Sequence, residues 1–289
     1  MTNELLRQGK FGLPLSPPVT PYSDGAGEVL QIGSSVTSFR PGEKIVTHLT
    51  VHQDDNEPAT FTDIAAGLGH GAHGTLRKYA IFHESSLVKM PSTLGFREAA
   101  TLTCSKLTAW NALFGPGLAS TRTRVLESSG GVSDAALQFA LATGASVIDT
   151  TSSDLKAERL SSLGAHHVIN YKTTANWGEV AESLTPNNRG VDIVVDVGGH
   201  STVSQSLKAV KADGLVALTG LLGASEDFQL PSIMDGLAIS QFRGMNAIID
   251  EKLIKPVVDD RVFGFAEARE AYEYLEQQRH FSKIVIDVE

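Results

Sequence analysis

The sequence predicts an α/β protein that combines a doubly wound parallel sheet with a smaller, mostly β domain. From Arg124 onward, short apolar runs alternate with segments of helical periodicity, which is typical of βαβ units. The first hundred residues are rich in Gly, Pro and Thr, and turn signals such as Arg40-Pro41-Gly42-Glu43 separate their short apolar runs. At ~150 residues per domain, 289 residues accommodate both domains. We assign residues 1–105 and 250–289 to the β domain and residues 106–249 to the sheet domain.

Six strands and four helices can be placed in the sheet domain. The strands are expected at Arg124–Glu127, Ser146–Thr150, His166–Tyr171, Asp192–Val197, Gly214–Thr219 and Gln241–Gly244. The helices are expected at Val132–Thr143, Ser153–Leu163, Trp177–Leu184 and Thr202–Val210, the second of them capped by Ser152 or Ser153. A helix at Phe265–Gln278 and a strand at Ser282–Val288 follow, and this tail is expected to return to the first domain. The segment Thr47–Gly74 has no periodicity, which predicts a long loop bordering an active site.

Composition excludes several classes of function. A net charge of −9 and a pI near 5.5 argue against nucleic acid as a partner. The single cysteine, Cys104, excludes an intrachain disulfide and every zinc site that needs two or more thiolates. No apolar run reaches the ~18–20 residues of a membrane-spanning helix, and the first ten residues lack a leader pattern. We therefore expect a soluble cytoplasmic protein that acts on a small molecule without contacting a membrane.

A glycine-containing turn connects the first expected strand of the sheet to the following helix. Its sequence is Ser128-Ser129-Gly130-Gly131-Val132-Ser133. In this context such a turn brings a pyrophosphate onto the N-terminus of a helix. The alternative is a tight strand-to-helix connection that binds nothing, because only two glycines remain where three are usual.

The end of the second strand carries information about the nucleotide. Asp149-Thr150-Thr151-Ser152-Ser153-Asp154-Leu155-Lys156 stands where dinucleotide folds meet the adenosine ribose. An acidic residue at the tip of the strand would accept hydrogen bonds from both ribose hydroxyls, whereas small hydroxyls and a cation suit a 2′-phosphate. Ser152, Ser153 and Lys156 thus favour NADP(H), the alternative being an N-cap serine and a solvated lysine.

Several segments together resemble one enzyme superfamily. They are Leu107–Phe114, the Gly130–Ser133 turn, Thr150–Ser153, Leu163–Ala165 with Val168–Tyr171, and Arg279–Phe281 with Lys283. In combination they resemble the medium-chain dehydrogenase/reductase superfamily over nearly the whole chain. The branch they resemble is that of the zinc-independent, quinone-oxidoreductase-like alcohol dehydrogenases. This resemblance implies a GroES-like β domain, shortened at its N-terminus, beside a Rossmann domain that binds NADP(H).

The resemblance also implies which residues form the site. Ser129, Gly130, Gly131 and Val132 would face the pyrophosphate, and Ser152, Ser153, Lys156 and Tyr171 the adenosine end. Val197, Gly198, Gly220 and Leu221, at the carboxyl ends of later strands, would meet the nicotinamide and its ribose. Thr108 and Cys104 would approach the reacting ring.

The sequence departs from the zinc-dependent members of the superfamily. Those members hold the metal with two thiolates and a histidine from a Gly-His-Glu motif. The corresponding stretch, Tyr22–Glu28, has no histidine, and only Cys104 matches a ligand position. His48 and His52 have i,i+4 spacing, but nothing around them predicts a helix, so we expect solvated loop histidines. No metal is therefore expected.

Two further departures concern length and charge. Asn3–Arg7 resembles the remainder of a family segment whose tyrosine can serve in the active site, and a second contraction follows Gly244. Glu127, Asp134 and Asp149 place negative charge near the expected pyrophosphate, which predicts a cofactor that is bound weakly or has been lost. The alternative is that Glu127 and Asp149 point away or pair with Arg124 or Lys156.

These observations define the functional hypotheses. The leading one is a metal-independent NADP(H)-dependent oxidoreductase that transfers hydride to or from a small carbonyl, enone, quinone or alcohol. His73 is the preferred acid/base candidate, and Thr108 could donate to the carbonyl oxygen. The second is an isomerisation, dehydration or cyclisation without use of the cofactor, with Asp24 or Glu28 as further acid/base candidates. The third is a non-catalytic subunit of a homodimer that associates through the expected edge strand Gln241–Gly244.

Overall fold

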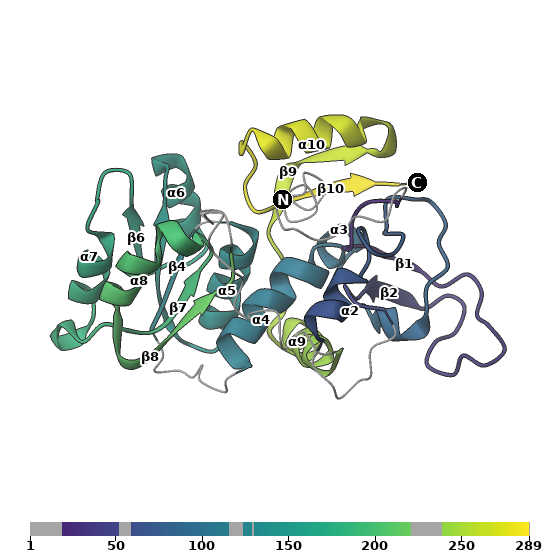
Figure 1. Ribbon diagram of the computed structural model, residues 1–289, viewed down its shortest axis with the longest axis horizontal. Helices are drawn as coiled ribbons and strands as arrows, with labels where there is room; N and C mark the ends of the chain where they lie inside the picture. The colour runs from purple at the N-terminus through teal and green to yellow at the C-terminus, as the bar shows by residue number, and fades with distance from the viewer. Residues whose placement is uncertain (1–18, 52–58, 116–123, 129, 221–238, 289) are drawn as a thin grey trace. The chain divides into compact units, whose positions relative to one another are not determined.

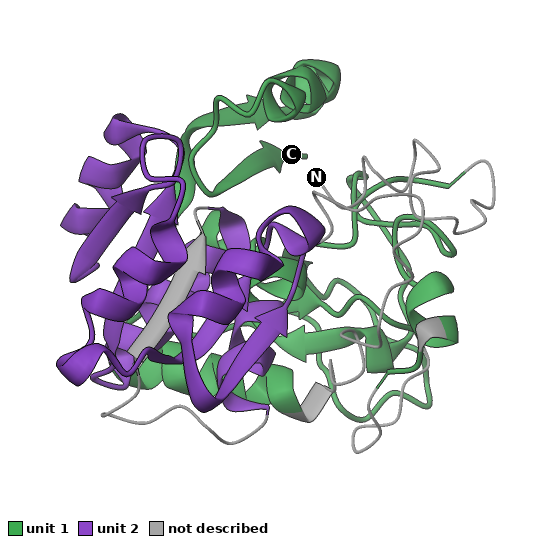
Figure 2. Ribbon diagram, turned by 60° about the vertical axis from the view of Figure 1, so that its left-hand side comes forward, with its two compact units in different colours: residues 1–107, 234–289 green, residues 108–233 purple. Residues whose placement is uncertain are grey.

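The computed structural model describes residues 19–51, 59–115, 124–128, 130–220 and 239–288 (Figure 1). The chain divides into two compact units (Figure 2). Unit 1 consists of residues 1–107 and 234–289, and unit 2 consists of residues 108–233. The chain therefore returns to unit 1 earlier than the boundary expected at residue 250.

Unit 2 contains the predicted parallel sheet. The five strands of this sheet that the structure describes are β4 (Arg124–Ser128), β5 (Ser146–Thr151), β6 (His167–Asn170), β7 (Val191–Asp196) and β8 (Val210–Leu218). Their order is β6-β5-β4-β7-β8, and every neighbouring pair is parallel. β7 reads Val-Asp-Ile-Val-Val-Asp and is almost wholly buried, as expected for a parallel strand covered on both faces. The predicted Rossmann class is confirmed.

Helices cover both faces of this sheet. They are α5 (Gly131–Ala142), α6 (Asp154–Ser162), α7 (Trp177–Ser183) and α8 (Val203–Ala209), and α4 (Leu107–Phe114) precedes them. Trp177 and Ala181 of α7 pack with Ile148 and Ile169 in a core on one face of the sheet. The apolar stripe expected for α5 is buried, since Ala135, Ala136, Phe139 and Ala140 are at most 2% exposed.

The strand order places a topological switch point between β4 and β7. The chain builds outward from β4 through β5 to β6, and then crosses to the other side of β4 for β7 and β8. Ligands of doubly wound sheets bind at the carboxyl ends of the strands where the order reverses. The Gly130–Gly131 turn follows β4 and Val197–Gly198 follows β7, so both predicted segments lie at this point.

Unit 1 contains two small sheets and several helices. One sheet is antiparallel, in the order β1 (Ala26–Glu28), β2 (Lys44–Thr47) and β3 (Leu87–Lys89), and the other pairs β9 (Val258–Gly264) with β10 (Lys283–Asp287) in parallel. Its α-helices are α2 (Phe61–Ala65), α3 (Phe96–Ala99), α9 (Ile239–Lys252) and α10 (Ala268–Glu276). Among the helices described in either unit, none has both the length and the apolar character required to cross a membrane.

The predicted strand Gln241–Gly244 is wrong, because these residues lie inside α9. Phe242, Met245 and Ile249 are fully buried and are three and four residues apart, which is helical spacing. The predicted strand covered only four residues, and so short a segment does not reveal a helical period. The sheet edge expected to mediate a homodimer is therefore not formed by this segment. The homodimer itself stays a prediction without this strand.

The predicted unpatterned loop Thr47–Gly74 is more ordered than expected. Thr60 and Asp63 form a capping box that starts α2 within it. His48 is fully buried and its Nδ1 lies 2.8 Å from the Thr50 hydroxyl, so the expectation of a solvated histidine was wrong for His48. His70 is also buried, and His52 lies outside the described residues.

Candidate functional site

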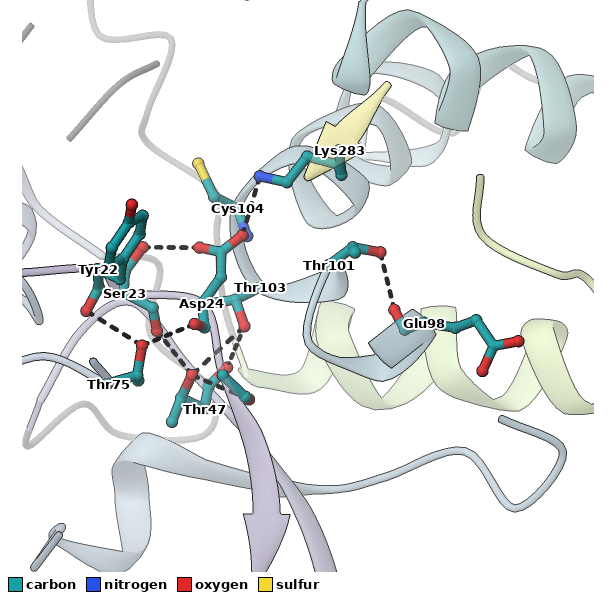
Figure 3. Close-up of polar contacts among 11 residues, drawn as sticks. Tyr22, Ser23, Asp24, Thr47, Thr75, Glu98, Thr101, Thr103, Cys104 and Lys283 are labelled. Carbon is teal, nitrogen blue, oxygen red and sulfur yellow. Dashed lines mark hydrogen bonds and ion pairs between the residues drawn. The ribbon is translucent and has the colours of Figure 1, made fainter. Parts of the chain in front are cut away.

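A carboxylate, a thiol and an ammonium group meet in unit 1 (Figure 3). The Lys283 ammonium donates a hydrogen bond to Asp24 Oδ2 at 3.3 Å, and the Cys104 backbone N–H donates to the same oxygen at 3.4 Å. The side chains of Lys283 and Asp24 are 26% and 13% exposed. We call Asp24, Cys104 and Lys283 the Asp24 cluster. It brings Cys104, a predicted catalytic residue, together with a lysine that we had not assigned to the site.

A wide helical turn positions Cys104. Residues Leu102–Lys106 form a π-helix that runs directly into α4. On this turn the Thr103 hydroxyl donates to the Thr47 carbonyl at 2.7 Å and ties the helix to β2. Turns of this kind are rare and often occur at functional sites. Here the turn leaves Cys104 half-buried, with its thiol on the side of the Lys283 ammonium (Figure 3).

Hydroxyl groups hold Asp24 in place. The Ser23 hydroxyl donates to Asp24 Oδ1 at 2.7 Å, and the Thr75 hydroxyl donates to the Asp24 carbonyl at 2.7 Å. The Thr47 hydroxyl in turn donates to the Ser23 carbonyl at 2.6 Å. Thr75 and Thr47 thus hold the backbone around Asp24, and the Ser23 hydroxyl orients its carboxylate.

The charges of the Asp24 cluster stabilise one another. Burial alone would lower the pKa of Lys283, but the charges of Asp24 and Cys104 and the hydrogen bond to Asp24 outweigh it. The pKa of Lys283 is therefore raised above its ordinary value. The lysine is a fixed cation at physiological pH and can bind an anionic or carbonyl oxygen, but it cannot serve as a base there.

The described residues do not fit a zinc ion. None of them form a group of three or more His, Cys, Asp and Glu side chains that could hold a metal. Cys104 and Asp24 provide at most two donors, whereas catalytic zinc takes three protein ligands. The ammonium of Lys283 also already neutralises the Asp24 carboxylate.

The pyrophosphate end of the predicted cofactor site lies at the start of α5 in unit 2. Gly130 is the N-cap of this 12-residue helix, and a side chain placed at Gly130 would meet no atom within 4 Å. The N–H groups of the first turn of such a helix can stabilise an anion together with the helix dipole. Gly131 and Val132 form that turn and are half-exposed, while Ser129 lies outside the described residues.

The adenosine end is expected at the tip of β5. Ser152 and Ser153 follow the strand and are half-buried, and Lys156 is the third residue of α6. Ser153 occupies the N-cap position of α6 without a capping bond from its side chain, so its hydroxyl is not used to start the helix. Tyr171 is 39% exposed and follows β6, the neighbouring strand. Their contact with a phosphate stays a prediction.

A buried carboxylate shapes the turn after β7. Asp196 Oδ1 accepts hydrogen bonds from the backbone N–H groups of Gly198 and Gly199, both at 2.9 Å. The hydroxyls of Thr202 and Ser206 donate to the same carboxylate at 2.5 and 2.7 Å. These four donors fix the turn that contains Val197 and Gly198.

The turn after β8 packs directly on this one. A Cβ at Gly220 would lie 1.8 Å from the Val197 carbonyl oxygen, so only glycine fits there. Gly220 and Val197 are thus held in contact at neighbouring strand ends. Leu221, the other residue predicted here, lies outside the described residues.

For two predicted catalytic residues, His73 and Thr108, the structure gives no side-chain hydrogen bond to the Asp24 cluster within the described residues. His73 is exposed, and its Nδ1 accepts a hydrogen bond from the Thr20 backbone N–H at 3.0 Å. Thr108 is half-buried on α4, and residues from 108 onward belong to unit 2. Their roles stay predictions.

Sequence reasoning missed Lys283 and Asp196 as site residues. Lys283 begins β10, and the next three residues of that strand are apolar. A single cation at the start of an apolar strand was the sequence signal that could have indicated a functional lysine. Asp196 ends β7 and is followed by Val197 and then the Gly198-Gly199 pair, a position from which a carboxylate can accept hydrogen bonds from the following backbone N–H groups.

Comparisons with known proteins agree with this arrangement. The family model for the GroES-like domain of alcohol dehydrogenases matches residues 2–92, and that of zinc-binding dehydrogenases matches residues 131–256. A zinc-type alcohol dehydrogenase-like protein of Schizosaccharomyces pombe is 39% identical, and the alignment covers 99% of this chain and 86% of that protein. The chain belongs to the medium-chain dehydrogenase/reductase superfamily. The predicted resemblance is confirmed.

Other members of the superfamily differ in the dinucleotide that their names state. An NADPH-dependent alkenal/one oxidoreductase of Arabidopsis thaliana is 29% identical over 97% of this chain and 67% of that protein. A solved NAD-dependent alcohol dehydrogenase is 28% identical with a TM-score of 0.84, covering 99% of this chain and 88% of that one. These members of the superfamily are oxidoreductases that use nicotinamide cofactors. Membership therefore leaves the choice between NAD(H) and NADP(H) to the residues of the chain.

Proposed function

We propose that this protein is an NADP(H)-dependent oxidoreductase that needs no metal and acts on a small carbonyl, enone, quinone or alcohol. The observation that carries the proposal is the tip of β5, which presents hydroxyls and a lysine where an NAD(H) enzyme places a carboxylate. The superfamily and the open glycine turn at α5 support a dinucleotide at this place.

Neither acidic residue near the tip of β5 stands free at the end of the strand. Asp149 is fully buried in the unit, and the Asp154 carboxylate accepts a hydrogen bond from the Asn170 amide at 2.7 Å. Of the residues between them, Thr150 and Thr151 are buried, whereas Ser152 and Ser153 are only half-buried. A 2′-phosphate would receive hydroxyl hydrogen bonds there and the charge of Lys156.

Three segments of unit 2 would bind and orient the cofactor, which supplies or accepts the hydride when bound. The first turn of α5 would hold the pyrophosphate, and Ser152, Ser153 and Lys156 the adenosine phosphate. The turn fixed by Asp196 would present backbone groups of Val197 and Gly198 to the nicotinamide end. Because that turn is rigid, its groups would be in position before binding.

The Asp24 cluster would stabilise negative charge on a substrate oxygen. A carbonyl that receives hydride develops negative charge on its oxygen, and a cation nearby stabilises it. Lys283 is held as a cation by Asp24, and the Cys104 thiol lies beside it. We assign Lys283 the role of an electrostatic group for substrate, with Asp24 as its positioning residue.

The test is direct binding of reduced dinucleotides. We expect NADPH to bind more tightly than NADH in a fluorescence titration, and Lys156→Ala to weaken NADPH about tenfold or more while leaving NADH nearly unchanged. Lys208→Ala is the matched control, because Lys208 is an exposed lysine that pairs with Glu179 on the surface. Equal affinity for both dinucleotides, or no binding at millimolar concentration, would contradict the proposal.

The relatives favour this function over a reaction without redox chemistry, because they are named as dehydrogenases and reductases. Turnover of a substrate by protein freed of all dinucleotide would reverse that preference.

A further inference from the structure

A group of buried polar side chains lies beneath the glycine turn of unit 2. Ser133 and Asp134 come from the first turns of α5, while Asp149 and Thr151 lie on the face of β5 that α5 covers. All four residues are at most 1% exposed. Neither carboxylate oxygen of Asp149 and neither hydroxyl of Ser133 and Thr151 has a hydrogen-bond partner of good geometry within the described residues. An ionised Asp149 would therefore be buried without the donors that it needs.

The causes that shift the pKa of Asp149 include no positively charged side chain of the described residues. On α5 the facing group is another acid, Asp134, and the residue of β4 in register with Asp149 is Glu127. The register partner on β6 is the apolar Val168. The pKa of Asp149 is raised well above its ordinary value, mainly by burial and then by the charge of Asp134. The backbone N–H of Thr150 lowers this pKa but offsets only part of the increase.

The pair lies next to the proposed pyrophosphate site. The backbone N–H of Asp134 donates to the Gly130 carbonyl at 2.8 Å, so Asp134 is one helical turn from the N-cap of α5. Two ionised carboxylates would place two negative charges behind the N–H groups that bind the anion. In the low-dielectric interior this repulsion is screened far less than in water.

We propose that Asp134 and Asp149 share one proton, and that a dinucleotide phosphate bound at the glycine turn favours the protonated pair, so that cofactor affinity falls as pH rises. This inference rests on the proposed function, because it requires the turn to bind the cofactor. It makes the two residues determinants of cofactor affinity without contact to the cofactor. If the anion disfavours ionisation of the pair, the proton must by reciprocity favour the anion.

The proton can be tested without any cofactor. In the folded protein Asp149 keeps its proton to a higher pH than in the unfolded chain, so its contribution to stability declines as pH rises from about 4 to its raised pKa. We expect urea unfolding midpoints between about pH 5 and 9 to fall more steeply for the wild type than for Asp149→Asn. Asp134→Asn should also flatten the slope, and it keeps the test available if the first variant fails to fold. Glu158→Gln, which removes an exposed carboxylate of α6, should leave the slope unchanged.

The coupling is tested by titrating the same proteins with NADP⁺ at each pH. If the bound anion raises the pKa of the pair by about one unit, the dissociation constant of the wild type rises about tenfold between pH 6 and 9. For Asp149→Asn the dissociation constant should change less than about twofold over the same pH range. This comparison is made after the effect of the titration of NADP⁺ itself, which is common to all variants, has been subtracted. Glu158→Gln should follow the wild type.

Each contrary outcome would overturn a defined part of the proposal. Identical stability slopes for the wild type and both Asn variants would overturn the shared proton. Different stability slopes with parallel binding curves would overturn the coupling to the cofactor. If Mg²⁺ stabilises the wild type but neither Asn variant, a bound cation rather than a shared proton neutralises the pair, and the proposal is overturned. If no form binds NADP⁺, the coupling fails with the proposed function, whereas the stability slopes still decide the shared proton.

Discussion

Asp196 and Asp149 are both buried carboxyl groups on strands of the same parallel sheet, yet their surroundings differ completely. Asp196 receives four hydrogen bonds, two from backbone N–H groups and two from hydroxyls. Asp149 faces another acid, and among the described residues no donor of good hydrogen-bond geometry reaches its carboxylate. The first carboxylate therefore organises a turn as an anion, whereas the second is stabilised by keeping a proton.

Asp24 in unit 1 shows a third arrangement, in which an ammonium group supplies the compensation. The three sites teach that burial of an acid does not by itself indicate its role. The donors around it decide whether it acts as an anchor, a proton carrier or half of an ion pair.

Removal of the Asp196 carboxylate should have the largest effect. Asp196→Ala leaves two N–H groups and two hydroxyls without their acceptor, so we expect a loss of about 3 kcal/mol or more in the free energy of unfolding. Ser206→Ala, which removes a single donor, should cost about 1 kcal/mol. Urea unfolding of both variants measures the difference. Equal losses would show that the carboxylate does not organise the four donors as one unit.

Breaking the ion pair between Lys283 and Asp24 in unit 1 should cause the second-largest loss of stability. Lys283→Met leaves the Asp24 carboxylate without its cation and should cost about 2 kcal/mol, less than for a fully buried pair because Lys283 is partly exposed. The raised pKa of Lys283 means that this contribution persists at neutral pH and disappears only as pH rises above about 10.5. Asp24→Asn combined with Lys283→Met should cost less than the sum of the single changes. Additive losses in thermal unfolding would argue against a direct interaction.

Replacement of Asp149 should have the opposite sign. Asp149→Val exchanges an unsatisfied acid for an apolar side chain suited to a strand, so we expect a gain of about 1–2 kcal/mol at pH 8. The gain should shrink toward pH 5, where the wild-type acid is protonated in both states more of the time. Chemical denaturation at the two pH values checks this. Destabilisation at pH 8 like that of Asp196→Ala would erase the contrast between the two acids.

Asp250 is a further carboxylate whose charge is stabilised by hydrogen bonds, and its replacement should have the smallest effect on stability. Its carboxylate accepts bonds from the backbone N–H groups of Ser92 and Thr93 at 3.0 and 2.9 Å. Burial opposes ionisation, but these bonds outweigh it and lower the pKa of Asp250. Asp250→Asn should therefore cost about 0.5–1 kcal/mol at neutral pH, and the cost should vanish as pH falls below about 3. Stability curves of both proteins between pH 2 and 7 test the sign.

The sheet of unit 2 was predictable because its signals are local. Apolar runs such as Val191–Val195 form strands wherever both faces are covered, and Gly130–Gly131 marks the turn before a helix. The predicted strand Gln241–Gly244 failed for the same reason, since four residues cannot distinguish a strand from one turn of a buried helix.

The compensation of buried charges was not predictable, because partners come from distant parts of the chain. Asp24 and Lys283 are 259 residues apart, so no window of sequence shows that they meet. The sequence did place negative charge near the glycine turn, and it left open whether Asp149 points away. Only the packing of α5 on β5 shows that Asp149 lies inside, facing Asp134.

The π-helical turn at Leu102–Lys106 links the length of the chain to its chemistry. A π turn holds one residue more than an α turn over the same path, so deletion of one residue would leave a regular helix that folds equally well. The side chains of the segment would then change phase, which would carry Cys104 away from Lys283. A deletion could therefore leave a helix and still dismantle the Asp24 cluster, and alignments of relatives should show constant length here.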